Sequence, residues 1–189
     1  MEFTHAAFFV YSVITTSDGR QLSGYAVYNL YQYGDRPDVS HLVQDYPVDF
    51  FAGAAVLDAG LIIPSAELQR RLLRIFEAKT YAAVHVPAYS VIANPFTLER
   101  QNCTEFVLDV INAAIYQTTN KILLKNAAKA YFTAQSVDVS PFKLMLGAMF
   151  SAELTLKDQS GPPVTATFET IRSYLLKYDT GAETMRVLP

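Results

Sequence analysis

Two prolines interrupt an apolar segment that lies just before the most regular helical pattern in the chain. Residues 87–96 begin with Pro87 and reach Pro95, and proline lacks an amide donor and restricts the residue before it, so this segment cannot be helical throughout. Apolar residues then recur with the spacing of one buried helix face at Phe106, Val107, Val110, Ile111, Ala114 and Ile115. The chain must therefore pass from an irregular loop into a helix near residue 102.

Cys103 is the lone cysteine of the 189-residue chain, and this pattern places it in the first turn of the helix. Amide hydrogens at a helix start lack intrahelical partners, so they can stabilise an anionic sulfur and lower the thiol pKa below about 8.5. A thiolate is the form that attacks carbonyl carbon. The alternative is structural, because free cysteine often serves as a small buried hydrophobe.

The neighbours of Cys103 favour a helix start but do not by themselves favour catalysis. Asn102 is a good capping residue, and Glu105 stands where its carboxylate can reach back to the amide of the cap. That carboxylate would also place negative charge near the sulfur and oppose thiolate formation. A catalytic role for Cys103 therefore requires a partner base.

His5 is the first candidate for that base. It opens a run over residues 4–14 that is rich in aromatic and β-branched side chains and reads as a buried strand. After a turn at residues 17–19, a second strand is predicted over residues 24–31, and its alternation places Tyr25, Val27, Asn29 and Tyr31 on one face. Asn29 is the polar exception on that face, and it could orient the His5 imidazole.

These segments together resemble a known group of enzymes. The order of a His-Ala pair at a strand start, a polar residue on the next strand and Asn-Cys-x-Glu at a helix start is similar to circularly permuted NlpC-type papain-like cysteine hydrolases. More closely, residues 3–118 resemble a bacterial family of uncharacterised proteins with a Gln-Asn-Cys motif. The matching residues are Thr4-His5-Ala6, Val27-Tyr28-Asn29-Leu30-Tyr31, Tyr89-Ser90, Pro95-Phe96 and Gln101-Asn102-Cys103.

The resemblance implies a role for each matching position. Cys103 would be the nucleophile, His5 the general base and then acid, and Asn29 the residue that orients the imidazole. Asn29 departs from the pattern, since other members carry an acid or Gln there, although a neutral amide can align an imidazole. The Cys103 amide, with Gln101 or Tyr89, could supply hydrogen-bond donors to an oxyanion.

The other histidines have ordinary interpretations. His41 is expected on an exposed polar connection over residues 38–43 and remains the reserve base. His85 precedes Pro87 and is interpreted as a structural hydrogen-bonding residue. With three histidines, one cysteine and no HxxxH or CxxC spacing, neither a metal site nor any other cofactor is expected.

Composition excludes several classes of protein. A hydrophobic fraction of 51% with 17% charged residues is typical of a globular domain. The formal charge of −3 and the lack of a basic cluster argue against nucleic-acid binding. No stretch approaches the roughly 20 apolar residues of a membrane span.

The compartment and the oligomeric state stay open. Glu2 precedes the first apolar run, which is unlike the basic start of a signal peptide. The family that the chain resembles commonly carries an export leader, so we expect a periplasmic or secreted protein if a leader has been trimmed and a cytoplasmic one otherwise.

The predicted fold is α+β, a permuted papain-like arrangement in one domain. A small antiparallel sheet packs on the Cys103 helix in a core over residues 1–118, and residues 119–189 form a mostly helical extension. Besides the elements above, the patterns predict a strand at residues 61–63, a helix over 66–79 capped by Ser65, and helical segments at 121–134, 142–150 and 168–178.

The expected function is a thiol hydrolase or acyl transferase that acts on a peptide or another acyl-containing substrate. Through the resemblance, a cell-wall peptide amide is the leading substrate and a lipid ester the second. An alternative is a catalytically silent, envelope-associated binding module that keeps the fold. A redox sensor is disfavoured because the chain has no resolving cysteine.

Overall fold

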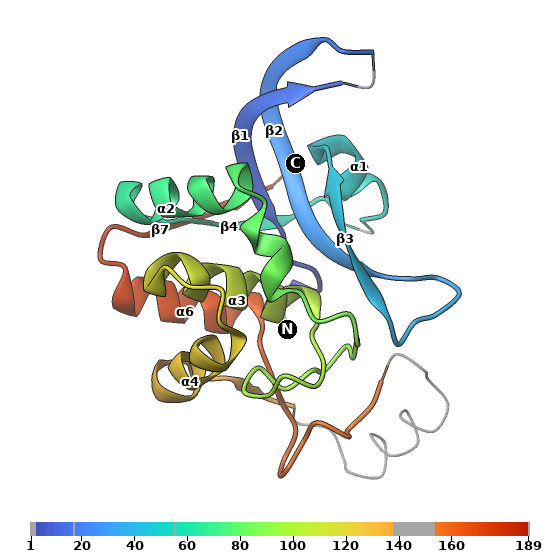
Figure 1. The fold of residues 1–189 in the computed structure, drawn as a ribbon, viewed down its shortest axis with the longest axis vertical. Coiled ribbons are helices and arrows are strands. Elements are labelled where there is room, and N and C mark those ends of the chain that lie inside the picture. Colours follow the sequence, from blue (N-terminus) through green and yellow to red (C-terminus); the bar gives the residue numbers. More distant parts are fainter. Residues whose placement is uncertain (1–2, 17, 55, 138–153, 189) are drawn as a thin grey trace.

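The protein is described by a computed structural model that covers residues 3–16, 18–54, 56–137 and 154–188. Helices pack beside small antiparallel sheets, so the predicted α+β class is confirmed (Figure 1). The predicted apolar segment 142–150 lies outside the described residues.

The largest sheet has three antiparallel strands in the order β1-β2-β3. β1 (Phe8–Thr15) and β2 (Gln21–Gln32) form a long hairpin that extends away from the helices (Figure 1). Gly19 closes its turn with φ 83°, a left-handed conformation that glycine adopts without steric cost. The sequence prediction of these two strands is confirmed, except that His5 precedes β1 instead of opening it.

The third strand corrects the expectation of an exposed polar connection. β3 (Ser40–Asp45) pairs with β2, with Tyr31 opposite His41. The His41 ring stacks on Tyr33 with 4.1 Å between ring centroids. The polar residues of this segment do not show the pattern of a strand. It forms a strand because β2 supplies its hydrogen-bonding partner, and such pairing depends on tertiary context.

Helix α2 (Ala66–Glu77) follows β4 (Ala59–Ile63), as predicted. The Ser65 hydroxyl accepts a hydrogen bond from the Leu68 amide at 3.3 Å, which caps the helix. Its buried face consists of Leu68, Leu72 and Phe76. Two short elements that the patterns did not indicate are α1 (Pro47–Ala52), which follows β3, and the 3₁₀ helix η1 (Thr80–Val84).

The C-terminal part adds strands as well as helices. β7 (Glu183–Val187) pairs antiparallel with β4, more than a hundred positions earlier in the chain. β5 (Gln135–Ser136) and β6 (Val164–Thr165) form a second two-stranded ladder. None of these three strands was predicted, because each is short and its partner is distant in the sequence.

Helix α3 (Cys103–Tyr116) lies at the centre of the fold. Residues 103–114 are all buried, and the helix packs against α2, η1, β2 and α4 (Figure 1). The predicted helices after it are α4 (Lys121–Tyr131), which stops short of residue 134, and α6 (Phe168–Tyr178). Among the described helices, none has both the length and the apolar character needed to cross a membrane.

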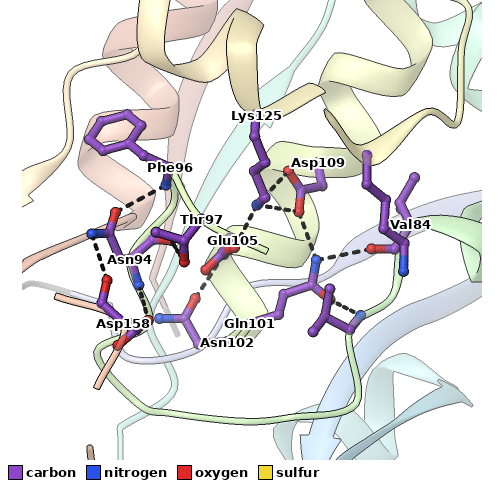
Figure 2. A network of polar contacts seen from close by, with 12 residues as sticks. Val84, Asn94, Phe96, Thr97, Gln101, Asn102, Glu105, Asp109, Lys125 and Asp158 are labelled. Atoms are coloured by element: carbon purple, nitrogen blue, oxygen red, sulfur yellow. Dashed lines mark hydrogen bonds and ion pairs between the residues drawn. The ribbon is translucent and has the colours of Figure 1, made fainter. Parts of the chain in front are cut away.

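A buried ion cluster joins α3 to α4. Lys125 Nζ lies 2.6 Å from Glu105 Oε1 and 2.8 Å from Asp109 Oδ2 (Figure 2). All three side chains are almost completely buried. Removing one partner of such a cluster leaves charge in the core without compensation, and this is far more costly than the loss of a surface ion pair.

Replacing Lys125 with methionine should therefore destabilise the fold strongly. We expect the free energy of unfolding to fall by about 3–5 kcal/mol, because two carboxylates lose their cation. Lys129→Met, on the exposed face of the same helix, should change it by less than about 0.5 kcal/mol. Urea denaturation followed by circular dichroism measures both values. Equal losses in the two variants would contradict a special contribution from the buried cluster.

Candidate functional site

The start of α3 is held by Asn102. Its Oδ1 accepts hydrogen bonds from the Glu105 amide at 2.8 Å and the Thr104 hydroxyl at 2.9 Å. Its Nδ2 donates to the Val91 carbonyl and to the Thr165 hydroxyl, each at 3.0 Å. The predicted helix cap is confirmed, and the same side chain also ties the helix to the loop before it and to β6.

Glu105 does not complete a capping box. Its carboxylate turns to Lys125 in the neighbouring helix (Figure 2). Burial raises the pKa of Glu105 well above its ordinary value, Asp109 raises it further, and Lys125 opposes both. The expectation that this carboxylate reaches back to the cap was therefore wrong, because a buried ammonium competes for it.

Gln101 is a buried structural residue. Its Oε1 accepts from the Val86 amide at 2.9 Å, and its Nε2 donates to the Val84 carbonyl at 3.2 Å and to Asp109 Oδ2 at 2.8 Å (Figure 2). Both side-chain amide hydrogens are thus used. In this arrangement the Gln101 side chain has no hydrogen left for an oxyanion.

Tyr89 is positioned by its backbone. Its amide donates to the Asp38 carbonyl at 2.7 Å, and its carbonyl accepts from Arg100 at 3.0 Å. An isolated parallel bridge joins Tyr89 to Gln101. Tyr89 therefore aligns the proline-containing loop beside the start of α3, and its participation in an oxyanion site stays a prediction.

The thiol of Cys103 is enclosed. The residue is 7% exposed, and burial raises the pKa of the thiol. Backbone amides of Ala6, Thr104 and Cys103 itself face the sulfur and lower the pKa by a smaller amount. The predicted fall in the thiol pKa is therefore not found, since loss of solvent outweighs the helix-start amides.

His5 meets Asn29, as the strand alternation predicted. His5 Nε2 lies 3.3 Å from Asn29 Oδ1. The imidazole stacks on Tyr31, with 5.0 Å between centroids and 2° between planes, and it also contacts Phe50 of α1. Asn29 is 1% exposed, so its amide is held in the core.

The structure also brings the His5 segment to the thiol. Ala6, the next residue after His5, presents its amide to the Cys103 sulfur, and the charge that Cys103 would carry raises the pKa of Tyr31. Cys103, His5 and Asn29 therefore share one neighbourhood although they come from different parts of the chain. Burial lowers the pKa of His5, with smaller opposing contributions from Asn29 and Asp45. Both shifts favour an uncharged pair of thiol and imidazole.

One residue at this place, Asp45, was missed by the sequence analysis. Asn29 Nδ2 donates to Asp45 Oδ2 at 3.2 Å, and the Tyr31 hydroxyl also hydrogen-bonds to Asp45, which raises the pKa of Tyr31. The pairing of Val27 with Asp45 places that carboxylate on the same face as Asn29. Reading residues 40–45 as a strand would have revealed it.

Of the remaining histidines, His85 follows η1, and His41 lies on β3 opposite Tyr31, on which the His5 ring stacks. His85 Nε2 is 3.0 Å from the Ser40 hydroxyl, which fits the structural interpretation, and its carbonyl accepts from Lys121 at 2.6 Å. His41 is on β3 beside Tyr33. Among the residues that the structure describes, no three His, Cys, Asp or Glu side chains form a group suited to a metal ion.

Comparison with known proteins assigns the chain to a family. Residues 1–175 match the family described as "uncharacterized protein conserved in bacteria (DUF2145)", and the protein belongs to it. No curated protein matches the chain, and no solved structure matches it either.

Burial and the nearby Lys121 and His41 lower the pKa of His85 from 6.5 to about 4, with burial as the largest cause. Between these two pH values, His85 binds a proton in the unfolded chain but stays neutral in the folded chain. The stability that depends on neutral His85 is therefore fully present above pH 6.5 and is lost as the pH falls toward 4. We expect His85→Gln, which can keep a hydrogen bond to Ser40, to lose less stability than the wild type between about pH 7 and about pH 4.5. Urea denaturation at both pH values measures the difference. Identical losses in the two proteins would contradict it.

Proposed function

We propose that the protein is a thiol hydrolase or acyl transferase that uses Cys103 as its nucleophile. The observation that supports this most directly is the Ala6 amide facing the Cys103 sulfur while the adjoining His5 ring is held by Asn29. A nucleophile, a base and a group that orients the base are the components that such a reaction requires.

The hydrogen bonds favour one ring nitrogen as the base. Asn29 Oδ1 can only accept, so His5 Nε2 carries the hydrogen and donates it. Nδ1 then keeps its lone pair. The thiol proton passes to Nδ1 as the sulfur attacks, because burial disfavours a thiolate in the resting state.

The reaction follows in two steps. The Cys103 sulfur bonds to the carbonyl carbon of an amide or ester, and His5 returns the proton to the departing amine or alcohol as the carbon–heteroatom bond breaks. Water or another acceptor then attacks the thioester and gives its proton to His5. As the carbon–sulfur bond breaks, His5 returns that proton to the sulfur, and the acid or the transferred acyl product is released. The amide of Cys103, near the sulfur, is the candidate donor to the oxyanion.

The proposed substrate is an amide or an ester. The reaction starts from a neutral thiol and a neutral imidazole. The resemblance to papain-like hydrolases of the NlpC type makes a cell-wall peptide amide the leading candidate. A lipid ester is the second.

Acylation by an activated ester tests the assignment. With p-nitrophenyl acetate as the probe, we expect Cys103→Ala to abolish protein acylation and His5→Ala to slow it by roughly 10²–10⁴-fold, the usual contribution of a general base. His41→Ala, at another half-buried and ring-stacked histidine, is the matched control and should acylate at the wild-type rate. Mass spectrometry locates the acyl group; an acyl group on another residue in the wild type would refute the assignment.

The pH dependence of acylation should report His5. The base must be neutral, and burial keeps the pKa of His5 below 6.5, so the rate should rise with pH through an inflection below 6.5 and then level off. Stopped-flow measurement of nitrophenolate release gives the profile. An inflection above 6.5 would contradict a buried, uncharged imidazole as the base.

A second candidate function is a catalytically silent, envelope-associated binding module. The enclosure of Cys103, together with a thiol pKa raised by burial, favours it. Alkylation by iodoacetamide distinguishes the two functions. In the hydrolase, His5→Ala lowers the alkylation rate near neutral pH, whereas in the silent module the rate simply rises toward an inflection above about 8.5 and does not depend on His5.

A further inference from the structure

The orientation of the Asn29 amide decides which nitrogen of His5 is available as a base. An amide side chain has one accepting and one donating end, and only its partners show which end faces where. Asn29 lies between His5 and Asp45, at 3.3 Å and 3.2 Å respectively. An imidazole can accept or donate, but a carboxylate only accepts.

Asp45 therefore removes the ambiguity. Its Oδ2 requires the Nδ2 end of Asn29, and the Oδ1 end must then face His5. Because Oδ1 accepts, His5 Nε2 must carry the hydrogen, and Nδ1 is left with its lone pair. Without the carboxylate, the Asn29 amide could turn over and donate from Nδ2 to His5 Nε2. Nδ1 would then carry the ring hydrogen and could not act as the base.

We propose that Asp45 is a positioning residue that selects the Nε2–H tautomer of His5 through Asn29. The proposal rests on the proposed function only for its consequence at Cys103, because the tautomer can be observed without any reaction. The hydrogen-bonded chain runs from β3 through β2 to the segment before β1, so it depends on the three-stranded sheet.

Tyr31 supports the arrangement from two sides. Its ring stacks on the imidazole, and its hydroxyl hydrogen-bonds to Asp45. The groups around His5 are thus Asn29 and Tyr31 on β2, Asp45 on β3 and Phe50 on α1, and Cys103 on α3 interacts with Tyr31. Among these, Asp45 carries the fixed negative charge, and that charge raises the pKa of His5 against the larger effect of burial.

Nitrogen-15 NMR of the imidazole rings in the full chain tests the proposal. The signals of His5 are assigned by their loss in His5→Ala. Above its pKa, wild-type His5 should show the Nε2–H tautomer. Asp45→Asn, which can either donate or accept, should give a mixture of both tautomers and a lower His5 pKa. Asp45→Glu should restore the single tautomer.

The matched control is Asp49→Asn, which removes an exposed carboxylate from the nearby helix α1 and should leave the His5 signals unchanged. A wild-type His5 in the Nδ1–H form overturns the proposal whether or not the variants fold. A tautomer and pKa that are the same in wild type and folded Asp45→Asn also overturn it.

Acylation measured on the same variants separates this proposal from the proposed function. If Cys103 acylates, Asp45→Asn should slow it by at least about tenfold and move its inflection to lower pH, whereas a merely structural role would not move the inflection. If wild-type Cys103 does not acylate but the His5 tautomer responds to Asp45→Asn, the hydrolase is refuted and the positioning role of Asp45 is supported.

Discussion

The buried amides of Gln101 and Asn102 hold the start of helix α3, and the arrangement of the site depends on them. A loop broken by Pro87 and Pro95 cannot satisfy all of its backbone groups internally. The backbone groups of Val84, Val86 and Val91 find partners in these two side chains. The same two amides reach Asp109 and Thr165. The position of Cys103 is therefore set by hydrogen bonds that involve neither its sulfur nor a substrate.

Burial acts differently on the two polar clusters around this helix. In the cluster of Glu105, Asp109 and Lys125, opposite charges offset part of the cost of leaving water, although burial still raises the pKa of both carboxyl groups. For Cys103, the described groups that lower the thiol pKa are backbone amides and not a cation, and the loss of solvent raises the thiol pKa and lowers the imidazole pKa. Both shifts favour an uncharged thiol and imidazole, which is the starting state that the proposed general-base attack requires.

Elements with local signals could be predicted from the sequence. Helix α2 follows the Ser65 cap and its apolar spacing, and α6 coincides with its predicted range. The hydrogen bond between His5 and Asn29 agrees with the alternation along residues 24–31, which singled out Asn29 as the polar residue that could orient the imidazole. Strands β3 and β7 could not be predicted, since their polar or exposed residues become strands only when β2 and β4 supply hydrogen-bonding partners. Asp45 was missed for that reason.

The sequence alone determined where a helix begins at Asn102 and which residues line the buried faces of the predicted helices and strands. Those properties depend on neighbours along the chain, through proline, capping and periodicity. Only the tertiary structure decided that the Glu105 carboxylate pairs with Lys125, that the Gln101 side chain hydrogen-bonds to Asp109 in the core, and that Asp45 accepts a hydrogen bond from Asn29. Each choice is a competition among polar groups for buried partners, and its outcome depends on which strands and helices come together.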